Sequence, residues 1–292
     1  MKSILRILTL FILSIILGVS ISIILNGFSI ENLNSEKSEL SIISNTGVDL
    51  YILLSQSTTI LLPALLFLIF FHRSNIANWI KINPPKQSIF FVLSILFLFM
   101  AYPLIEFSAG INSKLQIAEW MQSESKMAGQ ITKMILTIDS PLILIVRILL
   151  IGLLPAIGEE LYFRAGIQNE LIKSMKNPDI AIVISAILFS AFHMQFDGFL
   201  PRFFLGLMLG YLYFWSKSIL VPILVHFINN SMLVVSAYLM QDKIDEISNN
   251  SIQQIPTLIL ILSMIAIFML RSLMIRLKQS EQVISDKNEY DE

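Results

Sequence analysis

The apolar residues of this chain fall into long runs separated by short polar stretches. A membrane-spanning helix needs about 20 mainly apolar residues, and eight runs approach or reach that length: 4–26, 51–71, 88–107, 141–161, 179–195, 200–215, 219–240 and 257–275. The first run continues to Leu25 without a small-residue cleavage site, so we expect a retained helix and not a signal peptide. The pattern predicts an all-α protein, a polytopic membrane helix bundle with about eight transmembrane helices.

The composition indicates the same environment. Only 14% of the 292 residues are charged and 55% are apolar, whereas soluble chains carry about 25% charged residues. The net charge of −1 and the lack of a basic stripe exclude a nucleic-acid-binding protein. The chain has no cysteine, which excludes disulfides, thiolate nucleophiles and cysteine metal ligands.

The basic residues predict the orientation of the spans. Threading eight spans from a cytoplasmic N-terminus places 13 of the 20 Lys and Arg residues inside, 6 outside, and Arg147 within a span. Because basic residues favour the cytoplasmic side, we expect an integral multi-pass protein of a bacterial cell membrane with both termini in the cytoplasm. The sequence offers no explanation for Arg147.

Two segments differ from the spans. Residues 113–137 place apolar side chains at helical spacing among polar ones, which predicts a helix lying in the membrane interface. Such a helix either gates substrate entry or merely rests on the lipid surface. Residues 279–292 are polar and predict a disordered cytoplasmic tail.

Two carboxylates and an arginine stand at the end of a strongly apolar run. They are Glu159, Glu160 and Arg164. An ionisable group within a span is costly and needs a partner or a function. If the helix continues through this segment, Glu160 and Arg164 lie four residues apart on one face and can form an ion pair. Glu159 then lies about 100° around the helix from Glu160.

The chain has three histidines. His72 stands at the end of a span beside an arginine, and we expect a solvated loop residue. His193 lies near the end of an apolar run and shares a helix face with Phe189, four residues earlier. His226 lies within another apolar run and shares a face with Asn230.

Each of these groups alone is compatible with a structural role, but together they supply what a hydrolytic site needs. A carboxylate in a low-dielectric site is suited to general base work, and Glu159 fits that role. His193 would orient a water or pass a proton to the leaving nitrogen. His226 and Asn230 would donate hydrogen bonds to the tetrahedral intermediate.

The same residues permit a zinc site as an alternative. Glu159, His193 and His226 would form a set of two histidines and one glutamate with an open position for water. The H-E-x-x-H helix of many zinc proteases is missing. Serine chemistry is less favoured, because no serine stands in a G-x-S-x-G context. We therefore expect no cofactor, with zinc as the alternative.

Three motifs of the chain resemble, in order, those of the CAAX prenyl protease and bacteriocin-processing (CPBP, or Abi) family of intramembrane endopeptidases. The motifs are Glu159-Glu160-x-x-x-Arg164, Phe189-x-x-x-His193 and His226-x-x-x-Asn230. The resemblance covers roughly residues 141–240. The family was first classified as metalloproteases and is now generally regarded as glutamate-dependent.

The resemblance implies a role for each motif residue. Glu159 would activate the water, with His193 as its partner. His226 and Asn230 would stabilise the oxyanion, and the family spacing selects Asn230 over the neighbouring Asn229. The supporting residues would be Glu160 and Arg164.

The resemblance also implies a division of the chain into four parts. These are N-terminal transmembrane helices with the interfacial helix (1–140), a catalytic core (141–240), a C-terminal transmembrane helix (241–278) and the tail (279–292). We expect an endopeptidase that hydrolyses membrane-associated proteins or peptides, prenylated CAAX-type or bacteriocin-like, within the lipid bilayer. The rival hypotheses are a proton-coupled transporter and a non-catalytic membrane immunity or scaffold protein.

Overall fold

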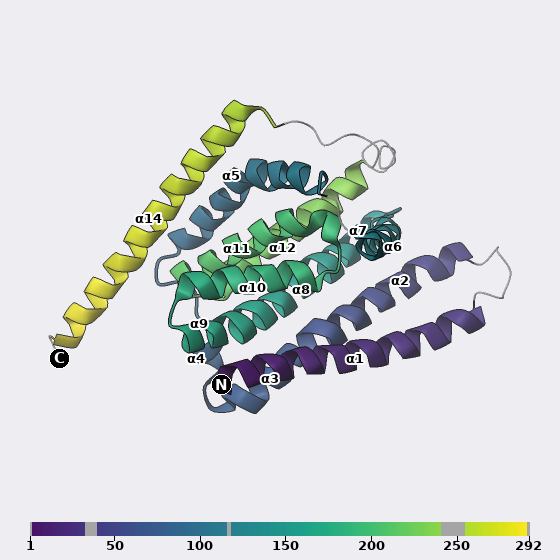
Figure 1. Ribbon diagram of the computed structural model, residues 1–292, viewed down its shortest axis with the longest axis horizontal. Coiled ribbons are helices and arrows are strands. Elements are labelled where there is room, and N and C mark those ends of the chain that lie inside the picture. Colours follow the sequence, from purple (N-terminus) through teal and green to yellow (C-terminus); the bar gives the residue numbers. More distant parts are fainter. Residues whose placement is uncertain (1, 33–39, 116–117, 241–254, 291–292) are drawn as a thin grey trace. The chain divides into compact units, whose positions relative to one another are not determined.

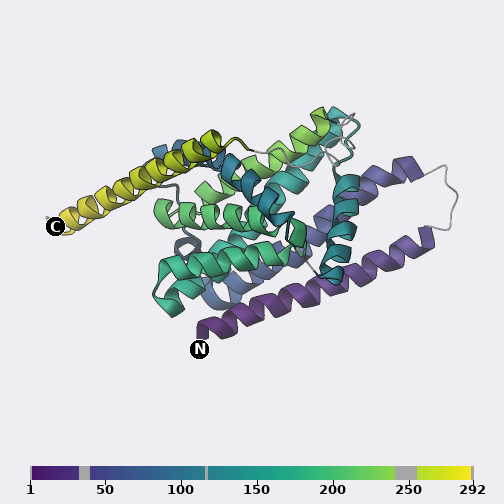
Figure 2. The same ribbon diagram turned by 45° about the horizontal axis from the view of Figure 1, so that its top comes forward.

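The computed structural model describes residues 2–32, 40–115, 118–240 and 255–290. Within these ranges the regular structure is helical and contains no strand, which confirms the all-α prediction (Figures 1 and 2). In chain order the elements are α1 (Lys2–Asn32), α2 (Leu40–Gln56), η1 (Ser57–Leu61), α3 (Leu62–His72), η2 (Arg73–Asn75), α4 (Ile76–Ile80), α5 (Ile89–Asn112), α6 (Glu119–Ile135), α7 (Pro141–Arg147), η3 (Ile148–Leu153), α8 (Leu154–Glu159), η4 (Glu160–Gln168), α9 (Asn169–Met175), α10 (Pro178–Phe192), η5 (Phe196–Gly198), α11 (Phe199–Ser216), α12 (Leu220–Leu239) and α14 (Thr257–Tyr290).

All eight apolar runs fall in helices, which confirms the polytopic helix bundle. Six helical stretches of the described chain are long and apolar enough to cross a membrane: Lys2–Ile21, Gly47–Ile80, Ile89–Asn112, Pro141–Met175, Leu220–Leu239 and Thr257–Ser280. The two remaining runs form α10 and α11, of 15 and 18 residues, which are not among the six. By length and composition the structure thus supports six spans, where the sequence predicted about eight.

The chain divides into two units, each assembled from separate stretches. Unit 1 contains Met1–Ile80, Met127–Ala181 and His226–Asn249, and unit 2 contains Lys81–Lys126, Ile182–Val225 and Asn250–Glu292. Each unit combines stretches from more than one of the consecutive ranges that the sequence predicted as domains. In unit 2, α14 continues to Tyr290 through the predicted disordered tail, because residues 279–290 contain no glycine or proline to end the helix.

A continuous helical stretch of unit 1 carries the first motif. It begins after Ser140, whose side chain accepts a hydrogen bond from the Ile143 amide at 3.3 Å. It ends at Lys176, which adopts a left-handed conformation with φ of 56°. The helix therefore runs on past the charged residues, as predicted. Two of its parts, η3 and η4, are π-helical, a wider geometry that is frequent at functional sites.

The first helix packs against this stretch. In both views α1 lies alongside α2 and α3 within unit 1 (Figures 1 and 2). Ser14 Oγ donates a hydrogen bond to Tyr162 Oη at 2.9 Å. At Gly166 an added Cβ would come within 2.9 Å of Leu10 Cδ2, so the glycine lets the two helices approach closely.

Buried ion pairs also join the helices of unit 1. Arg147 is fully buried, and its Nε lies 3.1 Å from Asp49 Oδ1 on α2, which supplies the partner that the sequence did not reveal. His72 is not the predicted solvated residue, since its side chain is only 8% exposed. Its Nε2 lies 3.1 Å from Glu170 Oε1, and Arg6 Nη1 donates to the same oxygen at 2.8 Å. Folding brings the buried Glu170 carboxylate to this histidine, which explains the difference.

In unit 2, α5 packs against α11 and α14. Ser263 Oγ of α14 donates to the Met100 carbonyl at 2.5 Å. Lys81, at the start of the unit, holds its ammonium 4.4 Å from the centre of the Tyr213 ring. Burial, together with the nearby Lys278 and Lys217 ammoniums, lowers the pKa of Lys81 to about 8.

The pair of Arg147 and Asp49 gives a testable prediction for unit 1. Asp49→Asn should destabilise the protein by about 3–5 kcal/mol, because it leaves a buried guanidinium without a counter-charge. The double variant with Arg147→Met removes both charges and should regain most of that loss. Thermal unfolding of the purified protein in detergent measures both effects, and losses that simply add in the double variant would contradict the pairing.

Candidate active site

The first motif lies within the helical stretch of unit 1. Glu159 ends α8, Glu160 begins η4, and Arg164 follows one turn later. All three are buried, and Glu159 is the most exposed at 5%. Arg164 Nε lies 3.0 Å from Glu160 Oε2, which confirms the predicted ion pair. The chain thus buries two carboxylates beside a single guanidinium.

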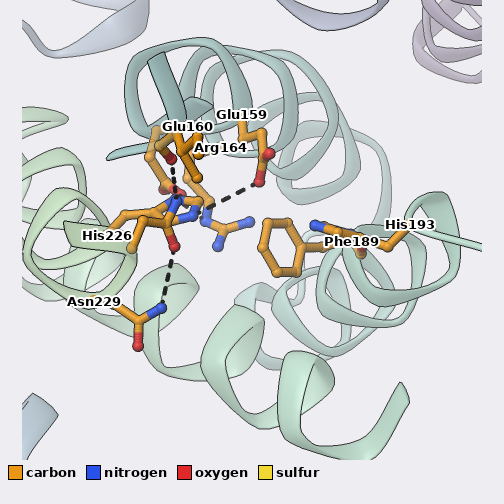
Figure 3. Close-up of polar contacts among 9 residues, drawn as sticks. Glu159, Glu160, Arg164, Phe189, His193, His226 and Asn229 are labelled. Atoms are coloured by element: carbon orange, nitrogen blue, oxygen red, sulfur yellow. Dashed lines mark hydrogen bonds and ion pairs between the residues drawn. The ribbon is translucent and has the colours of Figure 1, made fainter. Parts of the chain in front are cut away.

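His226 of α12 lies between these two carboxylates (Figure 3). Its Nδ1 lies 2.9 Å from Glu160 Oε1, and its Nε2 lies 3.7 Å from Glu159 Oε2. A carboxylate oxygen accepts hydrogen bonds, so the proton of this short contact resides on Nδ1. The ring therefore presents its other nitrogen toward Glu159.

The two carboxylates differ in how fully they are engaged. Glu160 contacts Arg164 with one oxygen and His226 with the other. Glu159 Oε2 accepts no hydrogen bond from the described residues, and its 3.7 Å separation from His226 is too long for one. Glu159 is therefore the carboxylate that can receive a further polar group.

The formal charge of this cluster depends on His226. With both glutamates ionised, Arg164 charged and the imidazole neutral, the four side chains sum to −1. A second proton on the imidazole brings the sum to zero. The cluster is almost fully buried, where an unbalanced charge is costly.

Asn230 is held by its neighbours in unit 1. Its Nδ2 donates to the Ile151 carbonyl at 3.3 Å, and Asn229 Nδ2 donates to its Oδ1 at 3.2 Å. Asn229 thus orients the amide of Asn230. Each amide NH₂ has two hydrogens, so Asn230 can donate one more hydrogen bond.

A glycine permits this approach of α12 to η3. At Gly152 an added Cβ would lie 2.6 Å from Ser231 Oγ and 3.3 Å from the Phe227 ring. Sequence reasoning overlooked Gly152. Its presence within an apolar run was the available signal, because small residues mark close contacts between membrane helices.

His193 belongs to unit 2, where it follows the last residue of α10. Its Nδ1 lies 2.9 Å from the Phe189 carbonyl oxygen, which can only accept, so Nδ1 carries the proton. The Phe189 ring packs edge-to-face on the imidazole at 5.2 Å, as the shared helix face predicted. Gly206 of α11 makes room for Phe189, since a Cβ there would lie 2.9 Å from that ring.

Unit 1 therefore brings together Glu159, Glu160, Arg164 and His226, with Asn230 one turn further along α12. The approach of His193 to these residues stays a prediction. For the zinc alternative, Glu159 Oε2 and His226 Nε2 face each other and are suitable donors. The described residues contain no group of three or more His, Asp or Glu placed to hold a metal ion.

Comparison with known proteins identifies the segment that holds all three motifs. Residues 141–232 match the family model of the Type II CAAX prenyl endopeptidase Rce1-like proteins. We call residues 141–232 the CPBP segment, because they match this family model and contain the three motifs that resemble the CPBP family. This CPBP segment is 30% identical over 94 residues to the membrane-embedded CAAX protease MroQ of Staphylococcus aureus (strain USA300), a match that covers 30% of this chain. The match spans only 38% of the length of that relative. No solved structure matches the chain.

The close contact at Gly152 gives the prediction for this site. Gly152→Ala should destabilise the protein by about 1–3 kcal/mol, because the new methyl group overlaps Ser231 and Phe227. Adding Ser231→Ala should recover part of the loss. The matched control is Gly129→Ala on α6, where an added Cβ meets nothing within 4 Å. Thermal unfolding in detergent distinguishes them, and equal effects at Gly152 and Gly129 would refute the packing.

Proposed function

We propose that this protein is an intramembrane endopeptidase that hydrolyses peptide bonds with a water activated by Glu159. The observation that carries the proposal is the asymmetry of the two adjacent carboxylates. Both oxygens of Glu160 lie within 3.0 Å of a nitrogen of Arg164 or His226, whereas Glu159 Oε2 lies 3.7 Å from His226 Nε2, which is too long for a hydrogen bond. A general base must have a lone pair available for the proton of the attacking water.

The proposed reaction begins when Glu159 takes a proton from a bound water and the hydroxide attacks the peptide carbonyl. The resulting oxyanion accepts hydrogen bonds from the Nε2–H group of His226 and from Asn230. Such a donor is typically worth about 2.7–4 kcal/mol in the transition state. The proton held by Glu159 then passes, through His193, to the leaving amine as the carbon–nitrogen bond breaks. Because His193 Nδ1 donates to Phe189, Nε2 is the nitrogen that transfers this proton.

Glu160 and Arg164 act through His226 in this proposal. Glu160 fixes the position of the Nδ1 proton and so orients the imidazole that donates to the oxyanion. Arg164 holds the Glu160 carboxylate in place through the 3.0 Å contact between its Nε and Glu160 Oε2. Loss of either residue would leave a buried charge without its partner.

The proposed substrate is a membrane-associated protein or peptide, either a prenylated CAAX protein or a bacteriocin-like peptide. This substrate class is supported by the CPBP segment and by the relative that is described as a membrane-embedded CAAX protease. The chain is a multi-pass membrane protein. The excess of Lys and Arg on one side supports an orientation with both termini in the cytoplasm of a bacterial cell.

The test is cleavage of lipidated and membrane-tethered peptides by the purified protein in detergent. Glu159→Gln should lower kcat by about 10²–10⁴-fold, the usual contribution of a general base. His193→Ala and His226→Ala should also abolish most cleavage. Glu106→Gln on α5 is the control, because Glu106 lies outside the CPBP segment. Cleavage that survives in Glu159→Gln would overturn the mechanism. If the wild-type protein cleaves none of the peptides, the result would favour the transporter or scaffold hypothesis.

A zinc-dependent protease is the second candidate, favoured by the facing donors of Glu159 and His226. His226 also donates its other nitrogen to a carboxylate, as zinc-bound histidines do. His193 would be the third ligand, and the metal would polarise the peptide carbonyl. A strong chelator separates the candidates. We expect cleavage to persist after chelation, and a loss that added zinc restores would select the metal enzyme.

A further inference from the structure

The link that follows His193 is held by side chains from outside the CPBP segment. Residues 194–198 connect α10 to α11 within unit 2. A link that breaks regular helix leaves backbone groups without helical partners, and in an apolar environment these groups require other partners. The identity of those partners decides how firmly His193 is placed.

Asn112, the last residue of α5, supplies three hydrogen bonds to this region. Its Nδ2 donates to the carbonyls of Phe196 at 2.9 Å and Asp197 at 2.7 Å. Its Oδ1 accepts from the Leu200 amide at 2.9 Å. Asn112 is only 2% exposed. Both hydrogens and the oxygen of this buried amide are thus committed to the backbone between α10 and α11.

Ser125 of α6 holds the same residues from another helix. Its Oγ accepts from the amide of Phe196 at 3.1 Å and from that of Asp197 at 3.5 Å. One turn earlier, Trp120 packs edge-to-face on the Phe196 ring at 5.4 Å. In both Phe196 and Asp197, the N–H group is therefore bound by Ser125 of α6 and the C=O group by Asn112 of α5.

The remaining contacts come from α10 and α11 themselves. Ser190 Oγ donates to the Phe199 carbonyl at 2.6 Å. Arg202 donates to the side chain of Gln195 at 2.9 Å and also to its backbone carbonyl. Met194, directly after His193, has a φ of 54°. His193 thus stands at the first residue of a sharp turn that is fixed within two to three residues on its far side.

We propose that Asn112 and Ser125 are positioning residues for His193. They act on the backbone of residues 196–200 and thereby keep the His193 imidazole on its Phe189 contact. Both precede the matched segment 141–232, so α5 and α6 contribute to a site that the motifs alone do not define. The expected effect of Asn112 and Ser125 on catalysis rests on the proposed function. Their expected effect on the position of the His193 imidazole does not.

Two pairs of variants test the inference. Ser125→Thr keeps the accepting hydroxyl. Ser125→Val introduces a side chain of nearly the same shape as threonine but without the hydroxyl. Asn112→Asp keeps the acceptor for Leu200 but loses both donors. Ser108→Ala is the control, because Ser108 is a buried residue on α5 that bonds only within its own helix, to the Ile105 carbonyl at 2.6 Å.

The first measurement is the imidazole ¹⁵N spectrum of the histidine-labelled protein. The chain has only three histidines, so His193→Gln and His72→Gln assign the signals. Wild type, Ser125→Thr and Ser108→Ala should show His193 protonated at Nδ1. Ser125→Val and Asn112→Asp should shift both His193 nitrogens toward a mixture of tautomers. An unchanged His193 signal in these two variants overturns the proposal, whether or not the protein cleaves peptides.

The second measurement is the kinetics of peptide cleavage. Misplacing a catalytic group by about 1 Å can cost on the order of 100-fold, so kcat should fall roughly 10- to 100-fold in Ser125→Val and Asn112→Asp. KM should stay nearly unchanged, and Ser125→Thr should retain activity. A lower melting temperature with unchanged kcat would show that these bonds only satisfy the backbone. If neither the wild type nor any variant cleaves peptides, the proposed function is contradicted. The spectral test of the His193 position remains valid in that case.

Discussion

The contact of Glu160 with both Arg164 and His226 is the interaction on which the candidate site depends. It brings both oxygens of one carboxylate within 3.0 Å of a partner, whereas Glu159 Oε2, on the adjacent residue, lies 3.7 Å from His226. It also fixes which nitrogen of His226 is protonated, because the carboxylate accepts at Nδ1. Two adjacent glutamates thereby become chemically different, although nothing in their local sequence separates them. The difference arises only when α12 packs against the helix that bears both residues.

That packing is governed by the scarcity of water around most of the chain. Buried polar groups must find partners inside the protein, and the described residues meet this demand between helices. Arg147 pairs with Asp49, and Glu170 contacts both Arg6 and His72. These contacts join α1, α2 and α3 to the stretch that carries Glu159. Helices that precede the CPBP segment therefore belong to the support of its first motif and are more than an anchor in the lipid.

The sequence predicted the features that depend on local spacing. The pair of Glu160 and Arg164 follows from their separation of four residues, and the contact of His193 with Phe189 follows from the same spacing. Contacts between distant segments could not be derived in this way. No periodicity relates Glu160 to His226, which are 66 residues apart, or Arg147 to Asp49. Such contacts depend on how closely two helices approach, and this is decided by single small residues such as Gly152.

The helical geometry between Arg147 and Glu159 decides where the length of this segment is part of the site. Each π-helical turn, as in η3, contains about one residue more than an α-helical turn. The loss of one residue from 148–153 can be absorbed when η3 tightens to an α-helix, whereas the loss of one residue from the α-helical part 154–158 would rotate Glu159 by about 100° relative to Arg147 and shift it by about 1.5 Å along the axis. The glutamates would then point away from α12 while every motif stayed intact. In alignments of related chains, an insertion or deletion within 154–158 therefore signals an altered site as clearly as a substitution in the motif itself.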